Sequence, residues 1–165
     1  MKRILLIEDN PEVSENTREI MELAGYEVVS APNGKIGVEL AQHEKPDLII
    51  CDIMMPELDG YGVLHILSKK PETSTIPFIF LTAKTEKTDI RKGMNLGADD
   101  YLTKPFDDTD LLHAIEARLH KSAMQQKLYE CTPEGLESFI LDAKDVLNLK
   151  DLCKDKKIKN LKKKA

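Results

Sequence analysis

Five polar side chains in this 165-residue chain stand at the ends of short apolar stretches, where folding could gather them. They comprise three carboxylates, one hydroxyl and one ammonium group: Glu8, Asp9, Asp52, Thr82 and Lys104. Groups of these kinds can bind a metal ion and stabilise negative charge on a substrate. What they can do together depends on whether the folded chain brings them to one place.

The three carboxylates would form a cation site if the segments that end in Glu8-Asp9 and in Asp52 are neighbouring strands. Like charges this close are unfavourable unless a cation or bound protons neutralise them. Mg²⁺ is a hard ion that accepts one or two carboxylates and keeps several of its waters. The residue types therefore favour a magnesium site, with Lys104 nearby as a counter-ion or a phosphate-binding group.

Asp52 is the candidate nucleophile of this set. An oxygen-ligated metal ion, a carboxylate, a hydroxyl and an ammonium group together indicate phosphoryl transfer through an aspartyl phosphate. Magnesium and Lys104 would spread the charge on the transferring oxygens, which supplies most of the catalysis in phosphoryl transfer. Thr82 could then donate a hydrogen bond to a phosphoryl oxygen.

The apolar pattern predicts the elements that must position these groups. The run Leu48-Ile49-Ile50-Cys51 is apolar on both faces, which is typical of a central strand in a parallel sheet covered by helices. Proline and glycine residues indicate a turn at Pro32-Asn33-Gly34 and a left-handed helix cap at Gly25. We expect strands at residues 3–7, 26–31, 48–51, 77–81 and 100–103, and helices around residues 13–24, 36–41, 60–67, 88–96 and 108–128.

The regular alternation of strand and helix predicts the fold class. Short connections and right-handed crossovers give an α/β fold, a doubly wound five-stranded parallel sheet with helices on both faces. In open sheets of this kind, ligands bind outside the carboxyl ends of the strands. Because the candidate groups stand at strand ends, the fold class predicts that they meet at this one edge.

The full set of motifs, in order along the chain, resembles the receiver domain of bacterial two-component response regulators. The resemblance covers about residues 2–121, and none of the motif positions departs from the family pattern. It implies a flavodoxin-like fold and a phosphorylation-dependent switch rather than an enzyme that turns over outside substrates. The motifs are Glu8-Asp9, Asp52, Met55-Pro56, Asp59-Gly60, Thr82-Ala83, Gly97-Ala98-Asp99-Asp100-Tyr101 and Lys104-Pro105.

The resemblance implies a phosphoacceptor and a set of metal ligands. Asp52 would accept the phosphoryl group. Asp9, Asp52 and the backbone carbonyl of Met54 would hold the magnesium ion, and Glu8 would reach the ion through water. Magnesium would therefore be required for phosphorylation.

The resemblance also implies roles for residues of the fourth and fifth strands. Lys104 would pair with the phosphoryl group, and the peptide bond between Lys104 and Pro105 would be cis. Thr82 and Tyr101 would form a coupled switch pair, in which Thr82 moves toward the phosphoryl group and Tyr101 turns inward. This movement would alter the face formed by the fourth helix, the fifth strand and the fifth helix.

The implied phosphodonor is a phosphohistidine on a sensor histidine kinase or a phosphotransfer protein. The switched face would be the site of a homodimer.

The charge of the receiver argues against direct nucleic-acid binding, because residues 1–120 hold 13 basic and 22 acidic residues, a net charge of −9. No apolar run is long enough to cross a membrane or form a signal-peptide core. The three separated cysteines suit a reducing cytoplasm.

Other interpretations explain these residues singly but not as a set. Asp52 could cap the following turn, Glu8-Asp9 could cap a helix, and Lys104 could be a solvated surface residue. A flavin-binding protein of this topology would need a loop rich in hydroxyl groups and glycine after the first strand, where Glu8-Asp9-Asn10 would repel a phosphate. A phosphatase that forms an aspartyl phosphate usually has a second acid two residues after the nucleophile, where this chain has Met54.

Residues 122–165 are expected to form a helical extension or linker. The C-terminal part of the chain is basic: residues 121–165 hold 11 basic and 7 acidic residues, a net charge of +4. Thr132-Pro133 could begin a further helix. The stretch 149–164 weakly resembles the opening of the sensor domain of Crp/Fnr-type regulators, as if a truncated output domain began there. Two outputs stay open: control of an attached output such as transcription, and a stand-alone phosphorelay or scaffold protein that signals by protein contacts.

Overall fold

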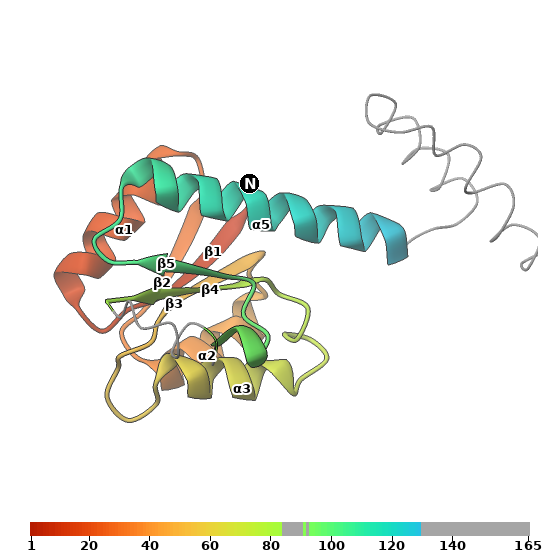
Figure 1. The fold of residues 1–165 in the computed structure, drawn as a ribbon, viewed down its shortest axis with the longest axis horizontal. Helices are drawn as coiled ribbons and strands as arrows, with labels where there is room; N and C mark the ends of the chain where they lie inside the picture. Colours follow the sequence, from red (N-terminus) through yellow and green to blue (C-terminus); the bar gives the residue numbers. More distant parts are fainter. Residues whose placement is uncertain (84–90, 92, 130–165) are drawn as a thin grey trace, which may run out of the picture. The chain divides into compact units, whose positions relative to one another are not determined.

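The core of the molecule is a five-stranded parallel sheet in the order β2-β1-β3-β4-β5 (Figure 1). The computed structural model describes residues 1–83, 91 and 93–129. The strands are β1 (Arg3–Ile7), β2 (Glu27–Ala31), β3 (Leu48–Asp52), β4 (Phe78–Thr82) and β5 (Asp100–Thr103). The helices are α1 (Pro11–Leu23), α2 (Gly34–Glu44), α3 (Gly60–Ser68) and α5 (Asp108–Tyr129). The predicted doubly wound α/β fold is confirmed.

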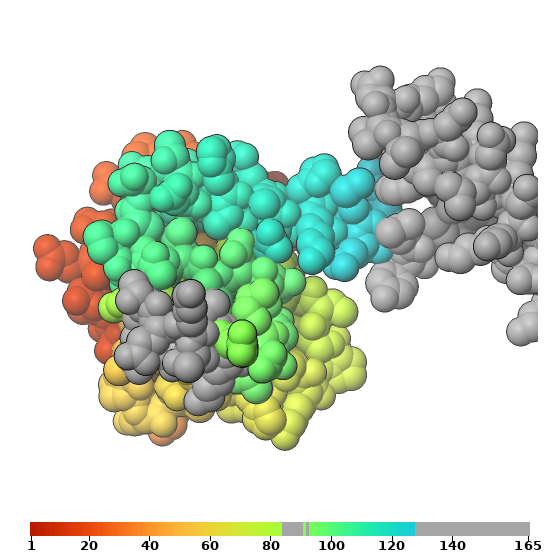
Figure 2. All heavy atoms as spheres, viewed as in Figure 1, coloured from red at the N-terminus to blue at the C-terminus, as the bar shows by residue number. Residues whose placement is uncertain are grey.

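Helices cover both faces of the sheet. The pair α1 and α5 lies on one face, and the pair α2 and α3 lies on the other (Figure 1). In the space-filling view, the yellow atoms of α3 and the green-to-turquoise atoms of the first half of α5 lie on opposite sides of the molecule (Figure 2). Each face has its own buried cluster, one centred on Ile4, Leu6, Ile50, Met21 and Leu111 and the other on Leu5, Ile7, Cys51, Val63 and Leu67.

The central strand β3 holds the most chemically interesting residue at its end. All five residues of β3 are buried, as expected for a strand with helices above and below it. Ile49 and Cys51 pack toward α2 and α3, whereas Leu48 and Ile50 pack toward α1 and α5. Burial of each large aliphatic side chain contributes about 1.5–3 kcal/mol. The strand therefore gives Asp52 a firmly fixed backbone position.

Some element boundaries differ from the predicted ones. The predicted turn at residues 32–34 is wrong in part, because Asn33 is the N-cap of α2 and Gly34 is its first residue. The Oδ1 atom of Asn33 accepts a hydrogen bond from the Ile36 amide at 2.9 Å, which satisfies a helix-terminal donor. Asp52 and Thr82 are the last residues of β3 and β4 rather than the first residues of loops.

Two predicted helix ends are confirmed. Gly25 follows α1 with a φ of +90°, a conformation that suits glycine, and α5 continues to Tyr129. Residues 91 and 93–95 are helical, but the rest of the helix predicted at residues 88–96 lies outside the described residues.

The contacts of the chain divide it into two units, Met1–Ser122 and Ala123–Ala165. The helix expected from Thr132-Pro133 and the stretch 149–164 both lie outside the described residues. None of the helices that the structure describes combines the length and apolarity needed to cross a membrane.

Candidate functional site

The strand register brings the predicted site residues to one edge of the sheet. Ile7, the last residue of β1, pairs with Cys51 of β3, so the next residues along each chain segment are Glu8 and Asp52. On the other side of β3, Asp52 pairs with Leu81, which precedes Thr82. These three side chains therefore belong to three neighbouring strand ends.

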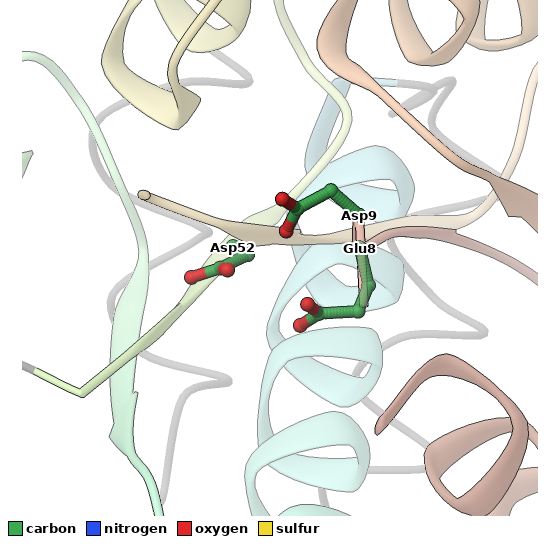
Figure 3. A group of neighbouring side chains, drawn as sticks. All are labelled: Glu8, Asp9 and Asp52. Carbon is green, nitrogen blue, oxygen red and sulfur yellow. The ribbon is translucent and has the colours of Figure 1, made fainter. Parts of the chain in front are cut away.

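Three carboxylates meet at this edge. One oxygen from each of Glu8, Asp9 and Asp52 lies within 4.8 Å of the others. The three side chains extend from the ends of β1 and β3 toward the same side (Figure 3). Glu8 and Asp52 are buried, whereas Asp9 is exposed to solvent. The cluster thus has a buried base and an opening at Asp9.

Lys104 provides the positive charge of the site. Its Nζ atom lies 2.6 Å from Glu8 Oε2 and 3.4 Å from Asp52 Oδ2. The backbone amide of Lys104 donates a hydrogen bond to the Thr82 carbonyl at 2.7 Å, which holds the chain after β5 against the end of β4. The peptide bond between Lys104 and Pro105 is cis. Sequence reasoning missed the ion pair with Glu8, because nothing in the sequence shows which acid the lysine reaches.

The electrostatics of the cluster favour a bound cation. Burial raises the pKa of the Glu8 carboxyl above its ordinary value, and the Lys104 ammonium and the Asn10 amide oppose this rise only in part. Among the residues that the structure describes, the three carboxylates of this cluster are paired with the one ammonium group of Lys104, so negative charge is in excess there. The donors are all oxygen atoms and one acid is open to solvent, which is the chemistry that Mg²⁺ requires. The residues present therefore fit a magnesium ion.

The loop between β3 and α3, residues 53–59, passes beside Asp52. The Met54 amide donates a hydrogen bond to Asp52 Oδ1 at 3.3 Å, so the backbone of Met54 lies against the carboxylate. Met54 is 57% exposed to solvent. The contact between Met54 and the Asp52 carboxylate is thus made by the Met54 backbone.

Thr82 and Tyr101 lie on adjacent strands. Thr82 is fully buried at the end of β4, where it pairs with Thr103 of β5. Tyr101 pairs with Phe80, two residues before the Thr82–Thr103 pair; it is half-buried, and its ring centroid lies 5.3 Å from that of Phe80. The structure therefore places Thr82 at the carboxyl end of β4, beside the acidic edge, and Tyr101 on the neighbouring edge strand β5.

Gly93 contacts Tyr101, which sequence reasoning also missed. A β-carbon at Gly93 would overlap the hydroxyl group and ring of Tyr101.

The histidines and Cys51 are not part of the candidate metal site. In the part of the chain that the structure describes, Glu8, Asp9 and Asp52 are the one cluster of suitable metal ligands, and it contains none of the four histidines. Cys51 is a buried free thiol whose burial raises its pKa, as expected for a core residue.

Comparison with known proteins gives a consistent result. Residues 4–116 match the family described as the response regulator receiver domain. The protein PilH of Pseudomonas aeruginosa is 44% identical over 119 residues, which cover 72% of this chain and 98% of PilH. The DNA-binding dual master transcriptional regulator RpaA of Synechocystis is 42% identical over 122 residues, which cover 74% of this chain and 51% of RpaA. The chain thus spans about half the length of that regulator.

A solved structure extends the comparison to the metal site. The receiver domain of a sensor histidine kinase from Pseudomonas aeruginosa matches 72% of this chain and 98% of its own, with a TM-score of 0.68 and 29% identity. That structure has a magnesium ion coordinated in its active site cleft.

Proposed function

The chain belongs to the family of response regulator receiver domains, and we propose that Asp52 is its phosphoacceptor. An Asp52 carboxylate oxygen attacks the phosphorus atom of a phosphohistidine on a partner kinase or phosphotransfer protein. The phosphorus–nitrogen bond breaks, the imidazole leaves with the electron pair of that bond and takes up a proton, and an aspartyl phosphate forms. The protein is then a switch in two-component signalling.

The meeting of Asp52 with Glu8, Asp9 and Lys104 is the single observation that carries this proposal. Asp52 is only 6% exposed, yet it has two other acids within 4.8 Å and an ammonium group at 3.4 Å. A structural acid at a strand end would need one partner for its charge. An excess of carboxylates around one lysine suits a site that binds a metal ion and receives a phosphoryl group.

We propose that Asp9, Asp52 and the Met54 carbonyl hold Mg²⁺, with Glu8 acting through water. A bound magnesium ion neutralises oxygen charge in phosphoryl transfer. Lys104 is already 3.4 Å from Asp52, so its ammonium group is placed to pair with a phosphoryl oxygen there. Lys104 also holds Glu8 at 2.6 Å, and this contact keeps the lysine extended toward the acidic edge.

The switch is proposed to run from Thr82 to Tyr101. A phosphoryl group on Asp52 adds charge and strong acceptor oxygens beside the end of β4, which favours movement of the Thr82 hydroxyl toward it. Tyr101 then turns inward and alters the face formed by β5 and α5 with the helical residues 91 and 93–95. Because packed elements have discrete arrangements, a small shift at Asp52 becomes a change between two states.

The chain is proposed to act as a cytoplasmic switch and not as an enzyme with outside substrates. Met54 stands two residues after Asp52, where a phosphatase of this chemistry would need an acid. The phosphoryl group therefore leaves by slow hydrolysis or by transfer to another protein. The acidic receiver is proposed to make no direct contact with nucleic acid.

Two outputs have separate support. The match to almost the whole of PilH favours a stand-alone receiver that signals through protein contacts. The match to about half of RpaA favours a receiver that controls an attached module, as in a transcriptional regulator. In both cases the switched face at β5 and α5 is the proposed contact surface, and a second copy of the chain is one partner for it.

Labelling with a small phosphodonor tests the proposed metal site. The chain should incorporate phosphate in the presence of Mg²⁺ and lose incorporation when EDTA removes the ion. Asp9→Asn should need a higher magnesium concentration, because it deletes one negatively charged ligand. Asp59→Asn is the matched control, since Asp59 caps α3 through the Gly62 amide and asparagine caps equally well. Labelling that persists in EDTA would contradict the proposal.

A further inference from the structure

The loop at residues 53–59, here called the metal loop, has a tightly determined path. The Met55 amide donates a hydrogen bond to the Ile53 carbonyl at 3.2 Å, and the Leu58 amide donates one to the Pro56 carbonyl at 2.8 Å. Glu57 has a φ of +67°, in the left-handed region. Since the loop has few free torsions, a displacement of Leu58 at one end is transmitted toward Met54 at the other.

The start of α2 approaches this loop closely at Gly34. A β-carbon at Gly34 would lie 2.6 Å from the Leu58 carbonyl oxygen, 2.9 Å from Val63 Cγ2 and 3.2 Å from Leu58 Cβ. The nearest of these atoms belongs to the backbone, so it cannot rotate away as the end of a side chain could. Helices α2 and α3 lie side by side on this face, with the loop leading into α3 (Figure 1).

Helix α2 is itself fixed on the sheet. One turn after Gly34, a β-carbon at Gly37 would overlap the side chain of Ile7, so α2 is in close contact with β1 there. Ala41 is fully buried, and Asn33 caps the first turn. Added volume at Gly34 is therefore relieved mainly by displacement of the metal loop rather than by movement of α2 into the sheet.

A second contact joins the same two segments but contributes little. Lys35 Nζ lies 2.6 Å from Glu57 Oε2, and both side chains are about two-thirds exposed, at 67% and 68%. Exposed ion pairs have small effects on stability because water and salt screen them. The position of the metal loop relative to α2 therefore depends on the close packing of Gly34 against Leu58 rather than on this ion pair.

We propose that Gly34 is a positioning residue for the metal loop. Because Gly34 has no side chain, α2 comes close enough to Leu58 to keep the Met54 backbone beside Asp52. The inference rests on the proposed function, which takes Asp52 and the Met54 carbonyl as magnesium ligands. It follows that a methyl group at Gly34 weakens magnesium binding although every ligand is still present.

Calorimetric titration of the full chain with MgCl₂ tests this role in Gly34→Ala. We expect the magnesium Kd to rise about tenfold, which corresponds to a misplaced but intact ligand set. In phosphodonor labelling, the midpoint in Mg²⁺ should shift by the same factor while the plateau at saturating Mg²⁺ stays near that of the wild type. A purely structural effect would lower the Tm in EDTA and leave the magnesium midpoint unchanged.

Two control variants separate the effect of the contact between Gly34 and the Leu58 backbone from the effects of neighbouring side chains. A β-carbon at Gly62 would lie 2.5 Å from Leu58 Cδ1, the end of a flexible side chain, and 3.4 Å from Asp59 Oδ1. Gly62→Ala thus adds the same methyl group next to the same leucine without touching the backbone of the loop. Lys35→Ala removes only the exposed ion pair. Both should keep the magnesium Kd within about twofold of the wild type.

A folded Gly34→Ala chain with an unchanged magnesium Kd would overturn the positioning role. If that variant does not fold, the wild-type chain is titrated with Mg²⁺ and followed by NMR. The Gly34 amide should then shift along the same saturation curve as the Met54 amide, and a Gly34 signal that does not respond overturns the inference. A wild-type chain that binds no Mg²⁺ contradicts the proposed function, and the positioning role falls with it.

Discussion

Burial of the ionised Glu8 carboxylate at the site lowers the stability of the fold. Its side chain is almost completely buried, and burial raises its pKa above the ordinary glutamate value. Lys104 stabilises the ionised form through the contact at 2.6 Å, and the Asn10 amide donates to Glu8 Oε1 at 3.1 Å. The upward direction of the pKa means that these contacts do not fully compensate for lost hydration.

The sign of this shift predicts the behaviour of Glu8→Gln without metal. Because the pKa of Glu8 is higher in the folded state than in the unfolded state, protonation of Glu8 favours folding. This stabilisation is fully present below the unfolded-state pKa, near 4.5, and is lost as the pH rises through the folded-state pKa. At pH 7 the ionised Glu8 therefore opposes folding. Glutamine keeps the shape and can still accept a hydrogen bond from Lys104, so the Tm in EDTA should rise by a few degrees at pH 7.

Thermal unfolding followed by circular dichroism across about pH 4 to 8 measures this effect. The difference in Tm between Glu8→Gln and the wild type should shrink toward the acidic end, where Glu8 is mostly protonated in both the folded and the unfolded state. Saturating Mg²⁺ should reverse the order, because the wild-type cluster binds the cation more strongly. A Glu8→Gln chain that is less stable in EDTA at pH 7 would show that the Lys104 contact outweighs the burial cost.

At the scale of the elements, helix α1 begins at the site and is held there by its cap. Asn10 Oδ1 accepts hydrogen bonds from the amides of Glu12 at 3.0 Å and Val13 at 3.2 Å. Asn10→Ala should lower the free energy of unfolding by about 1 kcal/mol in a urea titration, because two helix-terminal amides lose their acceptor. Asn10→Ser can still cap, so it should lose much less. Equal losses in the two variants would contradict the capping role.

Most elements could be predicted from the sequence because their signals are local. The buried run at Leu48–Cys51 predicted β3, and Gly25 predicted the end of α1. The side chain of Asn33 was misassigned to a turn, since the same residue type favours turns and helix caps for the same hydrogen-bonding reason. Local pattern therefore decided where the elements lie but did not fix every boundary, such as the start of α2.

The contacts of the site could be predicted only in part. Parallel strands placed Glu8 and Asp52 at one edge, because strand ends of a doubly wound sheet meet there. The pairing of Lys104 with Glu8 and the close approach of Gly34 to Leu58 depend on side-chain reach and helix placement across long sequence separations. No spacing along the chain encodes these distances.

At the scale of the whole receiver, β5 and α5 form the proposed output face. Arg118 links them, with Nη1 donating a hydrogen bond to the Asp99 carbonyl at 3.1 Å and Nε lying 3.5 Å from Asp100 Oδ2. Tyr101 lies on the same strand and packs against Phe80 of β4. The proposed movement of Tyr101 would therefore take place on the strand that carries Asp100, which lies close to Arg118 of α5.

Light scattering of the full chain tests whether this face joins two copies. We expect the molar mass to double when the chain is phosphorylated, because the switched face then becomes complementary to itself. Asp52→Asn under the same conditions should keep the mass of the untreated chain. A fully phosphorylated chain whose mass does not change would contradict homodimer output, and would favour a switch that acts on a different protein.

The central claim is that Asp52 receives the phosphoryl group, and peptide mass mapping after phosphodonor treatment tests it most directly. The account predicts one added phosphoryl group per chain in the presence of Mg²⁺, on the peptide that contains Asp52 and at that residue. Asp52→Asn should show none, while Asp59→Asn should be labelled like the wild type. A phosphoryl group mapped to another residue, or Asp52→Asn labelled to the wild-type extent, would contradict the account.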